Sequence, residues 1–284
     1  MDYSAKEGSH NPVHAPVVFS IRFSVLERNA KKKYRKQVQS ESLEKYRNEL
    51  FSEERLNRRL HSLVNVTLSS LAGQSDNKDV HALVYTSKGL PEKHFDALCG
   101  AVHSFPFAKI ISVGEDDRLE FDTNLSEILV SSSASLYAHV RIDDDDAISR
   151  DFVNRLREYI IEEHVGYAVS FGRGVAGVFD QESCRFTDFF DFYRSKISVG
   201  FALIGCFDPD AQSFLRKPSN AYALGSHSKA DRRAPVILDS RDISFIYAIH
   251  PDQDSSENSD GRRSDFGERI DIDEIKRIFA LGNV

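Results

Sequence analysis

Short apolar runs alternate with helical periodicity along the first half of the chain. The apolar runs, which predict buried strands, cover residues 16–23, 81–86, 108–113 and 135–142. Apolar residues spaced by three and four positions, together with capping residues, predict helices from Leu56 to Leu71, from Pro91 to Val102, over residues 124–132, and after Ser149 as N-cap. Strand and helix therefore alternate. This order predicts an α/β fold with a mixed, mostly parallel sheet that has helices on both faces.

The second half of the chain follows a different pattern. Strand-like segments without long helices between them lie at residues 167–171, 186–193 and 197–204. A last helix is expected from Asp271, which forms a capping-box start with Glu274. Residues 1–15 are predicted to be a flexible tail, and residues 16–284 a single domain with a polar loop at about 251–267.

Composition narrows the function classes. The formal net charge of −7 argues against general nucleic-acid binding, which needs a surplus of Lys and Arg. The three cysteines, Cys99, Cys184 and Cys206, are far apart and form no CxxC pair, which fits a reducing compartment. No run approaches the ~18 apolar residues of a membrane span, and the N-terminus lacks the apolar core of a signal peptide. A cytoplasmic protein is expected.

Four adjacent aspartates, Asp143 to Asp146, follow directly on the fourth predicted strand. Four neighbouring carboxylates repel one another unless solvent or a cation compensates their charge. In an extended chain Asp143 and Asp145 point to the same side, with Cα atoms roughly 6.6 Å apart, and could share a hard divalent cation. Open α/β sheets also bind their ligands at the C-terminal ends of their strands. The run therefore predicts an Mg²⁺ or Mn²⁺ site that holds a diphosphate.

Other interpretations of the acidic run were weighed. A solvated acidic turn before a helix is the plainest alternative, since acidic runs usually mark exposed faces. A calcium loop is excluded, because counting from Asp143 puts Ile148 at the glycine position and Asn154 at the glutamate position.

Two further signals carry less weight. Gly172 to Gly177 matches G-x-G-x-x-G, but extended chain follows it instead of a helix, so a glycine-rich hairpin is expected. The basic run Lys31–Lys36 could be a lid over diphosphate or a patch for anionic lipid, and a solvated loop is favoured.

Several segments resemble one known family. Arg141 to Val153, RIDDDDAISRDFV, resembles the "R-hydrophobic-D-x-D-D-A … DF" segment of the putative rhamnosyltransferase family of bacteria, which is related to GT-A-type glycosyltransferases. Stretches that agree in the same order are Ile21 to Leu26, Arg59 to Gln74 (RLHSLVNVTLSSLAGQ), Thr86-Ser87 with Leu90-Pro91, His227, and Ile249 to Pro251. The family's usual proline is replaced by Ser69, and its usual asparagine after the second late histidine is missing. The resemblance implies a GT-A-like domain.

The resemblance also implies a metal site. In GT-A enzymes the first and third acids of such a motif contact the metal and the nucleotide, so Asp143 and Asp145 would hold Mn²⁺ or Mg²⁺ here. Asp144 would be the variable position, and Asp146 a supporting acid near the sugar or its ribose. His250 is the predicted histidine ligand.

Donor binding is expected at the same sheet edge. His227 is a second choice for the late histidine. Arg22 and Ser87, at the ends of the first two predicted strands, would lie where the nucleotide base and ribose bind, and Arg141 would also contact the nucleotide sugar. Their plain alternative is that they are ordinary polar residues at strand ends.

The predicted function is metal-dependent transfer of a sugar from a nucleotide-diphosphate donor to a hydroxyl of a glycan or lipid-linked acceptor, with peripheral membrane contact left open. If the family holds, the donor is dTDP-rhamnose. An inverting reaction needs a general base. The acids open for this role are Asp188, Asp191, Asp239 and Asp242, and Asp239 and Asp242 are taken with Asp146 as the catalytic candidates. The alternatives are another metal-dependent nucleotide enzyme, such as a nucleotidyltransferase, and a non-catalytic sugar-binding module. Against a nucleotidyltransferase, no glycine lies between Phe19 and Gly73 to form a phosphate loop.

Overall fold

The computed structural model describes residues 15–26, 43–250 and 266–282. The predicted basic run at Lys31–Lys36, residues 1–14 of the predicted tail and residues 251–265 of the predicted loop lie outside these ranges. The end of the predicted loop is wrong, because strand β13 (Phe266–Arg269) begins there.

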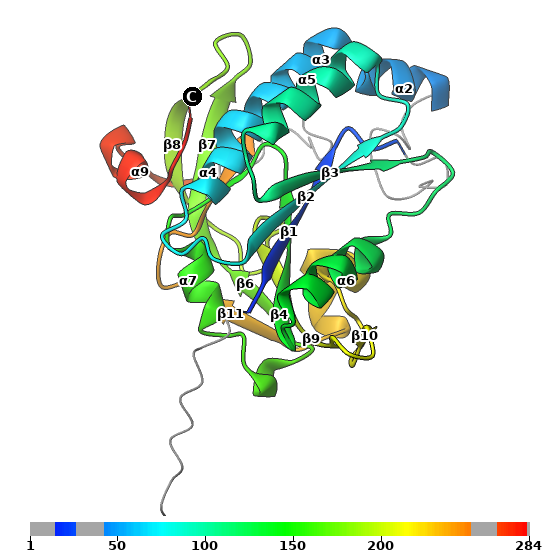
Figure 1. Cartoon of the computed structure of the whole chain (residues 1–284). Coiled ribbons are helices and arrows are strands. Elements are labelled where there is room, and N and C mark those ends of the chain that lie inside the picture. Colours follow the sequence, from blue (N-terminus) through cyan, green and yellow to red (C-terminus); the bar gives the residue numbers. More distant parts are fainter. Residues whose placement is uncertain (1–14, 27–42, 251–265, 283–284) are drawn as a thin grey trace, which may run out of the picture.

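The larger of two sheets confirms the predicted mixed, mostly parallel architecture (Figure 1). In spatial order its strands are β11 (Val236–Asp239), β6 (Ala168–Phe171), β9 (Phe201–Asp208), β4 (Leu136–Asp143), β1 (Val17–Phe23), β2 (Val80–Ser87) and β3 (Ala108–Val113), and β10 (Ser213–Phe214) pairs with β9. Strand β9 runs antiparallel to β4 and β6, whereas β1, β2, β3 and β4 are mutually parallel. The C-terminal ends of β4, β1, β6 and β11 therefore lie at one edge of the sheet.

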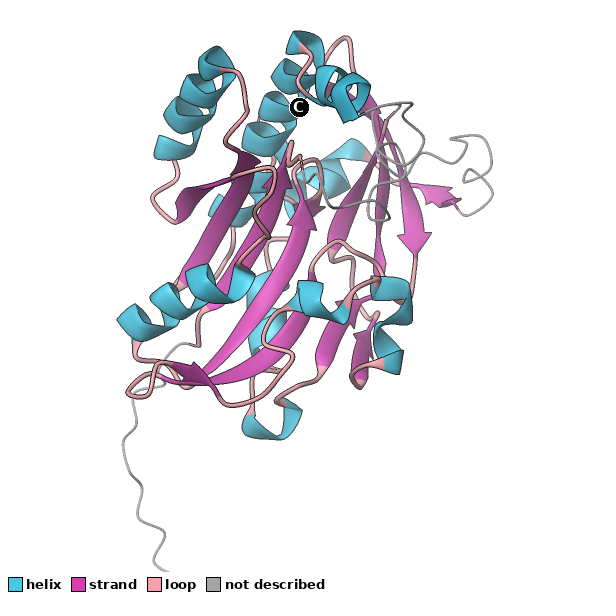
Figure 2. Cartoon of the chain, turned by 90° about the vertical axis from the view of Figure 1, so that its right-hand side faces the viewer, coloured by secondary structure: helices cyan, strands magenta, loops and turns pink. Residues whose placement is uncertain are grey.

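Helices cover both faces of this sheet (Figures 1 and 2). One face packs on α3 (Glu53–Ser62), the π-helix η1 (Leu63–Leu68), α4 (Ser69–Ala72), α5 (Glu92–His103) and α7 (Phe152–Arg157). The other face packs on α6 (Phe121–Ser132). Strand β1 shows the reason, because alternate side chains from Val17 to Phe23 enter the first core while Val18 enters the second.

A second sheet was not predicted. Its strands, in spatial order, are β13, β8 (Arg185–Tyr193), β7 (Arg173–Asp180), β12 (Phe245–Ile249) and β5 (Ala147–Ile148). Strands β7 and β8 form the hairpin that was expected at the glycine-rich segment. Helix α9 (Ile272–Ile278) packs on this sheet, and Asp271 caps it by accepting a hydrogen bond from Asp273 N.

The remaining elements are short. Helix α2 (Leu43–Leu50) precedes α3, and the 3-10 helices are η2 (Glu162–His164), η3 (Ala221–Leu224) and η4 (His227–Arg232). The predicted cap Ser149 is wrong, since Asp151 occupies the N-cap of α7. Within the described ranges, no helix has both the length and the apolar character needed to span a bilayer.

Buried His139 on β4 makes the stability of the folded state depend on pH. Its Nδ1 accepts a hydrogen bond from Ala221 N (3.0 Å), so Nε2 carries the proton shared with Ser20 Oγ (2.9 Å). Burial lowers the pKa of His139 to about 3. The unfolded imidazole takes up a proton below about pH 6.5 while the folded one stays neutral, so stability is lost as the pH falls.

We expect the free energy of unfolding to decrease by about 2 kcal/mol through this group between pH 7 and pH 5. The His139→Gln variant should lack that part of the slope, whereas His103→Gln, at an exposed position on α5, should keep it. Urea denaturation followed by circular dichroism at both pH values measures the slopes. Equal slopes in His139→Gln and the wild type would show that the buried imidazole is not the cause.

Candidate active site

The four aspartates form a tight turn and not the extended segment that was predicted. Asp143 is the last residue of β4, and Asp146 N donates to Asp143 O at 3.4 Å. The next residue, Ala147, starts β5 and pairs with Ile246 of β12 in the second sheet. The turn therefore carries the chain from one sheet to the other. It sends successive carboxylates in different directions, so Asp143 and Asp145 do not share one side as an extended strand would require.

Asp145 meets the late histidine that the sequence singled out. Asp145 Oδ2 lies 2.8 Å from His250 Nε2, although the two residues are 105 positions apart. His250 directly follows β12, which runs parallel to β7, so the ends of both strands lie together. Gln181, just after β7, places its Nε2 3.3 Å from His250 Nδ1. The two side chains of Asp145 and His250 are 20% and 11% exposed, which leaves them accessible at the edge of the turn.

Asp144 and Asp146 face inward. Asp144 is 1% exposed, and both of its oxygens accept hydrogen bonds from the guanidinium of Arg59 on α3, at 2.8 Å for Arg59 Nε. Burial nevertheless raises the pKa of Asp144 to about 6. Asp146 is also 1% exposed, and its Oδ1 accepts from Ala248 N at 3.1 Å. Burial, together with the neighbouring Asp145, raises the pKa of Asp146 well above its ordinary value.

These contacts change the role expected of Asp146. A side chain buried to this extent and bonded to the main chain of β12 does not reach a sugar or its ribose. It instead fixes Ala248, two residues before His250, against the acidic turn. We therefore replace the predicted catalytic role of Asp146 with a positioning one.

The helix formed by α3, η1 and α4 holds the main chain of the acidic turn in place. Thr67, in the π-helix η1, donates from Oγ1 to the carbonyl oxygens of Asp146 (2.9 Å) and Asp143 (3.3 Å). Gln74, just after the end of α4, donates from Nε2 to Ser149 O at 2.8 Å, which continues the same line of contacts. Buried polar groups are costly unless they are bonded, so these pairs fix the position of the turn relative to the helix.

The π-helix explains how Arg59 and Thr67 reach the same turn. In a regular α-helix, residues eight positions apart differ by about 80° around the axis, because each residue turns the chain by 100°. One extra residue in a π-turn reduces that difference to roughly 20°. The two side chains therefore lie on one face of the continuous helix formed by α3, η1 and α4.

Positive charge lies beside Asp143. Arg22, at the end of β1, has its Nη2 3.4 Å from Asp143 Oδ1, and its guanidinium lies 5.4 Å from the ring centroid of Tyr222. The guanidinium of Arg141 lies 4.9 Å from the same ring, which stacks on Phe121 at 4.3 Å. Burial would raise the pKa of Asp143, but Arg22 and Arg141 outweigh it and hold that pKa below its ordinary value.

Arg141 has hydrogen-bonding capacity to spare. Its Nε is buried and has no hydrogen-bond acceptor within the described part of the chain. Buried donors are rarely left without an acceptor, so each such atom needs an explanation. An anionic ligand at the end of β4 would supply one, because guanidinium groups recognise phosphate oxygens well.

His227 lies in the same neighbourhood and is neutral. Its Nδ1 donates to Lys196 O at 2.9 Å, which leaves Nε2 with a lone pair. Burial, followed by the charge of Arg141, lowers the pKa of His227, while Asp143 acts in the opposite direction. His250 therefore contacts the acidic turn directly, whereas His227 bonds to Lys196 O and feels the charges of Arg141 and Asp143.

Ser87 does not have the position expected of a ribose contact. The residue is fully buried, its Oγ accepts from Leu26 N at 2.7 Å, and the hydroxyl donates to Ser24 O at 3.2 Å. Both capacities of the hydroxyl are used to hold the segment after β1. Ser87 thus holds the segment after β1, and its buried hydroxyl does not present itself to a ligand.

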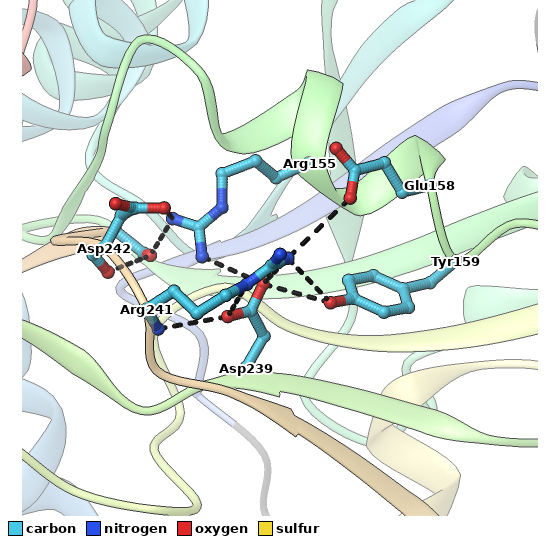
Figure 3. Close-up of polar contacts among 7 residues, drawn as sticks. Arg155, Glu158, Tyr159, Asp239, Arg241 and Asp242 are labelled. Carbon is cyan, nitrogen blue, oxygen red and sulfur yellow. Dashed lines mark hydrogen bonds and ion pairs between the residues drawn. The ribbon is translucent and has the colours of Figure 1, made fainter.

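Asp239 is fully engaged in a separate polar cluster (Figure 3). Its carboxylate accepts from Arg155 Nη2 (3.0 Å), Tyr159 OH (3.0 Å), and Arg241 Nε (3.1 Å) and Nη2 (2.9 Å). The Arg241 hydrogen bonds hold the pKa of Asp239 far below its ordinary value. Such a carboxylate does not suit a general base, and that prediction for Asp239 is corrected.

The other acids proposed as bases differ in their surroundings. Asp188 pairs with Arg269 at 2.7 Å on the second sheet. Asp191 pairs with Arg173 at 3.2 Å on the same sheet. Asp242 is 70% exposed, and within the described residues its carboxylate has a long ion-pair contact, 3.7 Å to Arg155 Nη1.

Some residues of the site were not singled out from the sequence. Arg59 and Thr67 interrupt an apolar helix pattern, and polar residues on a buried helix face were an available signal for them. Gln181 and Tyr222 carried no local signal, because only the packing of distant segments brings them to the turn.

The donor atoms fit a divalent cation only with help from a substrate. Within residues 15–26, 43–250 and 266–282, no three His, Cys, Asp or Glu side chains converge as a metal site of their own. Mg²⁺, however, is usually bound by one or two carboxylates together with substrate phosphates and water. The pair of Asp145 and His250 fits a cation that is shared with a diphosphate.

Comparison with protein-family models identifies a matching family for the chain. A family model described as "Putative rhamnosyl transferase" matches residues 17–262. Among curated proteins no sequence matches the chain.

Solved structures resemble the chain only distantly. TarS 1–349 from S. aureus has a TM-score of 0.38 and 10% identity, over 82% of this chain and 60% of the TarS chain. HddC from Yersinia pseudotuberculosis has a TM-score of 0.33 and 10% identity, over 83% of this chain and 89% of HddC. The bifunctional glycosyltransferase WbbM has a TM-score of 0.25 and 14% identity, over 61% and 25%. The chain thus spans three fifths of the TarS structure, and TM-scores this low carry no argument.

Proposed function

Because the chain belongs to the family described as putative rhamnosyl transferases, which are glycosyltransferases, we propose that it moves a sugar from a nucleotide-diphosphate donor to a hydroxyl of a glycan or lipid-linked acceptor. Rhamnose is the sugar proposed first, from the family description. The observation that carries the proposal is the meeting of Asp145 and His250 at the C-terminal edge of the parallel strands. Ligands of open α/β sheets bind at that edge.

The surroundings of Asp143 support a diphosphate at this edge. Arg22 and Arg141 supply positive charge beside the turn, and Arg141 Nε lacks an acceptor in the described part of the chain. Their guanidinium groups would offset the negative charge that gathers on the leaving diphosphate. Asp143 would keep Arg22 oriented through their 3.4 Å contact.

Asp145 and His250 would hold the Mn²⁺ or Mg²⁺ ion together with phosphate oxygens of the donor, whereas Asp143 pairs with Arg22. Such an ion neutralises charge on a departing diphosphate when it is bound. Asp146 and Thr67 would contribute by fixing the turn and the end of β12, so that Asp145 and His250 keep their relative positions.

Asp242 is the acid that we propose as general base. Of the four candidates it combines high exposure with the longest ion-pair contact, 3.7 Å to Arg155. In the reaction the acceptor oxygen bonds to the anomeric carbon, and the bond from that carbon to the diphosphate oxygen breaks. The hydroxyl proton passes to the carboxylate, and the nucleoside diphosphate leaves.

A donor screen tests the proposal. The purified chain is incubated with UDP-, GDP- and dTDP-sugars, with Mn²⁺ or with EDTA, and thermal stability and donor hydrolysis are recorded. One donor class should stabilise the protein in the presence of metal, by about 2.7 kcal/mol at 100 times its Kd. The same donor should be hydrolysed slowly without acceptor.

The screen also separates the alternatives. Stabilisation by nucleoside triphosphates alone would point to nucleotidyl transfer and would contradict the proposal. Binding of a sugar with no turnover of any donor would point to a non-catalytic module. Turnover that EDTA leaves unchanged would reject the metal while keeping sugar transfer.

A further inference from the structure

An exposed apolar patch lies at the same edge of the main sheet as the acidic turn. Tyr193, at the end of β8, is 56% exposed, and Leu238, on the edge strand β11, is 45% exposed. Both side chains close on Gly172, where an added Cβ would lie 3.2 Å from Tyr193 Cε2 and 3.0 Å from Leu238 Cδ1. The two residues are therefore neighbours, although they come from different sheets, and we call them the Tyr193–Leu238 patch.

Strand register places the patch relative to the acids. Val140 of β4, Ala202 of β9 and Val169 of β6 form one row across the sheet. Asp143 and Gly172 each lie three residues beyond that row, on strands two apart. At ordinary strand spacing they are about 10 Å from each other. The patch therefore lies on the side of Asp143 that faces β6 and β11, at the same edge of the sheet.

Hydrogen-bonding groups border the patch. Ser240 Oγ faces the same position, since it would lie 2.6 Å from a Cβ added at Gly172. On the other side, Arg173 pairs with Tyr193 in the β7–β8 ladder and forms an ion pair with Asp191. An apolar ring bordered by hydrogen-bonding groups suits a pyranose, because a sugar presents C–H groups on its ring faces and hydroxyls around its rim.

We propose that the Tyr193–Leu238 patch is the acceptor subsite, and that it binds a pyranose ring of the acceptor glycan against the face of Tyr193. This inference rests on the proposed sugar transfer, and it adds the residues that select the acceptor. Tyr193 and Leu238 are two of the large apolar side chains that are exposed in the described part of the chain, and they lie side by side.

Gly172 belongs to this subsite because it lets the ring lie close to the backbone. An added Cβ would come within 2.6 Å of Ser240 Oγ as well as touching the Tyr193 and Leu238 side chains. Replacing the glycine would therefore displace the patch. A glycine is needed here because there is no room for a Cβ, and not because the backbone has an unusual conformation.

The absence of tryptophan from the sequence gives a direct test. The Tyr193→Trp variant keeps an aromatic platform and introduces a single tryptophan whose fluorescence reports on the patch. The matched control is Leu215→Trp, which places the probe at a 63% exposed position after β10, at the opposite edge of the sheet. The probes are the methyl glycosides of rhamnose, glucose, galactose and N-acetylglucosamine.

We expect a saturable change in fluorescence for at least one glycoside with Tyr193→Trp and none with Leu215→Trp. The glycoside that saturates is then used as acceptor in the transfer assay. There, Tyr193→Ala should raise KM for the acceptor about tenfold with kcat changed less than twofold, and Tyr193→Phe should restore the wild-type KM. Leu215→Ala should leave both constants unchanged.

The outcomes separate the two proposals. If the wild-type protein turns over no donor, the proposed function is wrong. The fluorescence titration then still shows whether the patch binds sugars. A flat titration with every glycoside, or an unchanged acceptor KM in Tyr193→Ala, overturns the subsite. Light scattering that shows a dimer lost in Tyr193→Ala also overturns it, since the patch would then bind a second copy of the chain.

Discussion

Sugar transfer by the Asp145→Asn variant is expected to be about 10²–10³-fold slower than by the wild type. The substitution keeps the size of the side chain but removes the carboxylate charge that meets His250 Nε2 at 2.8 Å. An amide oxygen is a weaker ligand for a divalent cation, and it no longer offsets the cation's charge. The turn itself should persist, because Arg59, Thr67 and Ala248 hold its main chain and the inward-facing acids.

Two measurements isolate this effect. The rate is determined with the donor identified in the screen at saturating Mn²⁺, and the unfolding transition is recorded alongside to show that the fold is intact. The control is Asp151→Asn, six residues away on the surface, where an amide oxygen can still accept the hydrogen bond from Ser75 Oγ. A fully active Asp145→Asn enzyme would remove the acidic turn from the mechanism.

The second large effect concerns stability. Arg59→Leu should lower the free energy of unfolding by about 3–5 kcal/mol, because it leaves the Asp144 carboxylate buried without its partner. Asp144 could instead take up a proton. For a carboxyl with an ordinary pKa near 3.9 this costs about 4 kcal/mol at pH 7, which is a loss of similar size. Urea denaturation followed by circular dichroism measures the loss.

Further variants identify the cause. Asp144→Asn in the Arg59→Leu background should recover much of the loss, since no charge then remains buried. The loss in Arg59→Leu should also shrink at pH 5. Burial raises the folded pKa of Asp144, so the penalty grows as the pH rises from the unfolded pKa towards the folded one. Lys93→Met breaks an exposed ion pair with Glu53 and should cost less than 1 kcal/mol. An Arg59→Leu loss of that size would show that the buried pair contributes little.

The strands of the main sheet show how much of the fold could be predicted from the sequence. The apolar runs from residue 16 and from residue 135 correspond to β1 and β4, and the second of them ends at the first aspartate. Such runs are local, and their burial on both faces of a parallel sheet leaves few other conformations for them. The position of the acids at the C-terminal end of a buried strand could thus be predicted without coordinates.

The geometry of the acidic turn could not be predicted from the sequence. The prediction treated Asp143 and Asp145 as neighbours on one side of an extended chain, whereas the Asp146 N to Asp143 O contact closes a turn. The cause lies in a distant segment, because β5 pairs with β12 and draws the chain into a second sheet. No local pattern around residues 143–148 announces that pairing.

The sequence by itself determined strands β1 to β4 and the helices that follow them, the place of the acids at a strand end, and the family to which the chain belongs. Those features depend on residues that are near one another along the chain, where side-chain periodicity fixes the local structure. Only the tertiary structure decided that Asp144 and Asp146 face inward, that Asp145 meets His250, and that Tyr193 lies beside Leu238. Each of these contacts joins segments distant in sequence, and their meeting depends on how two sheets and a helix pack together.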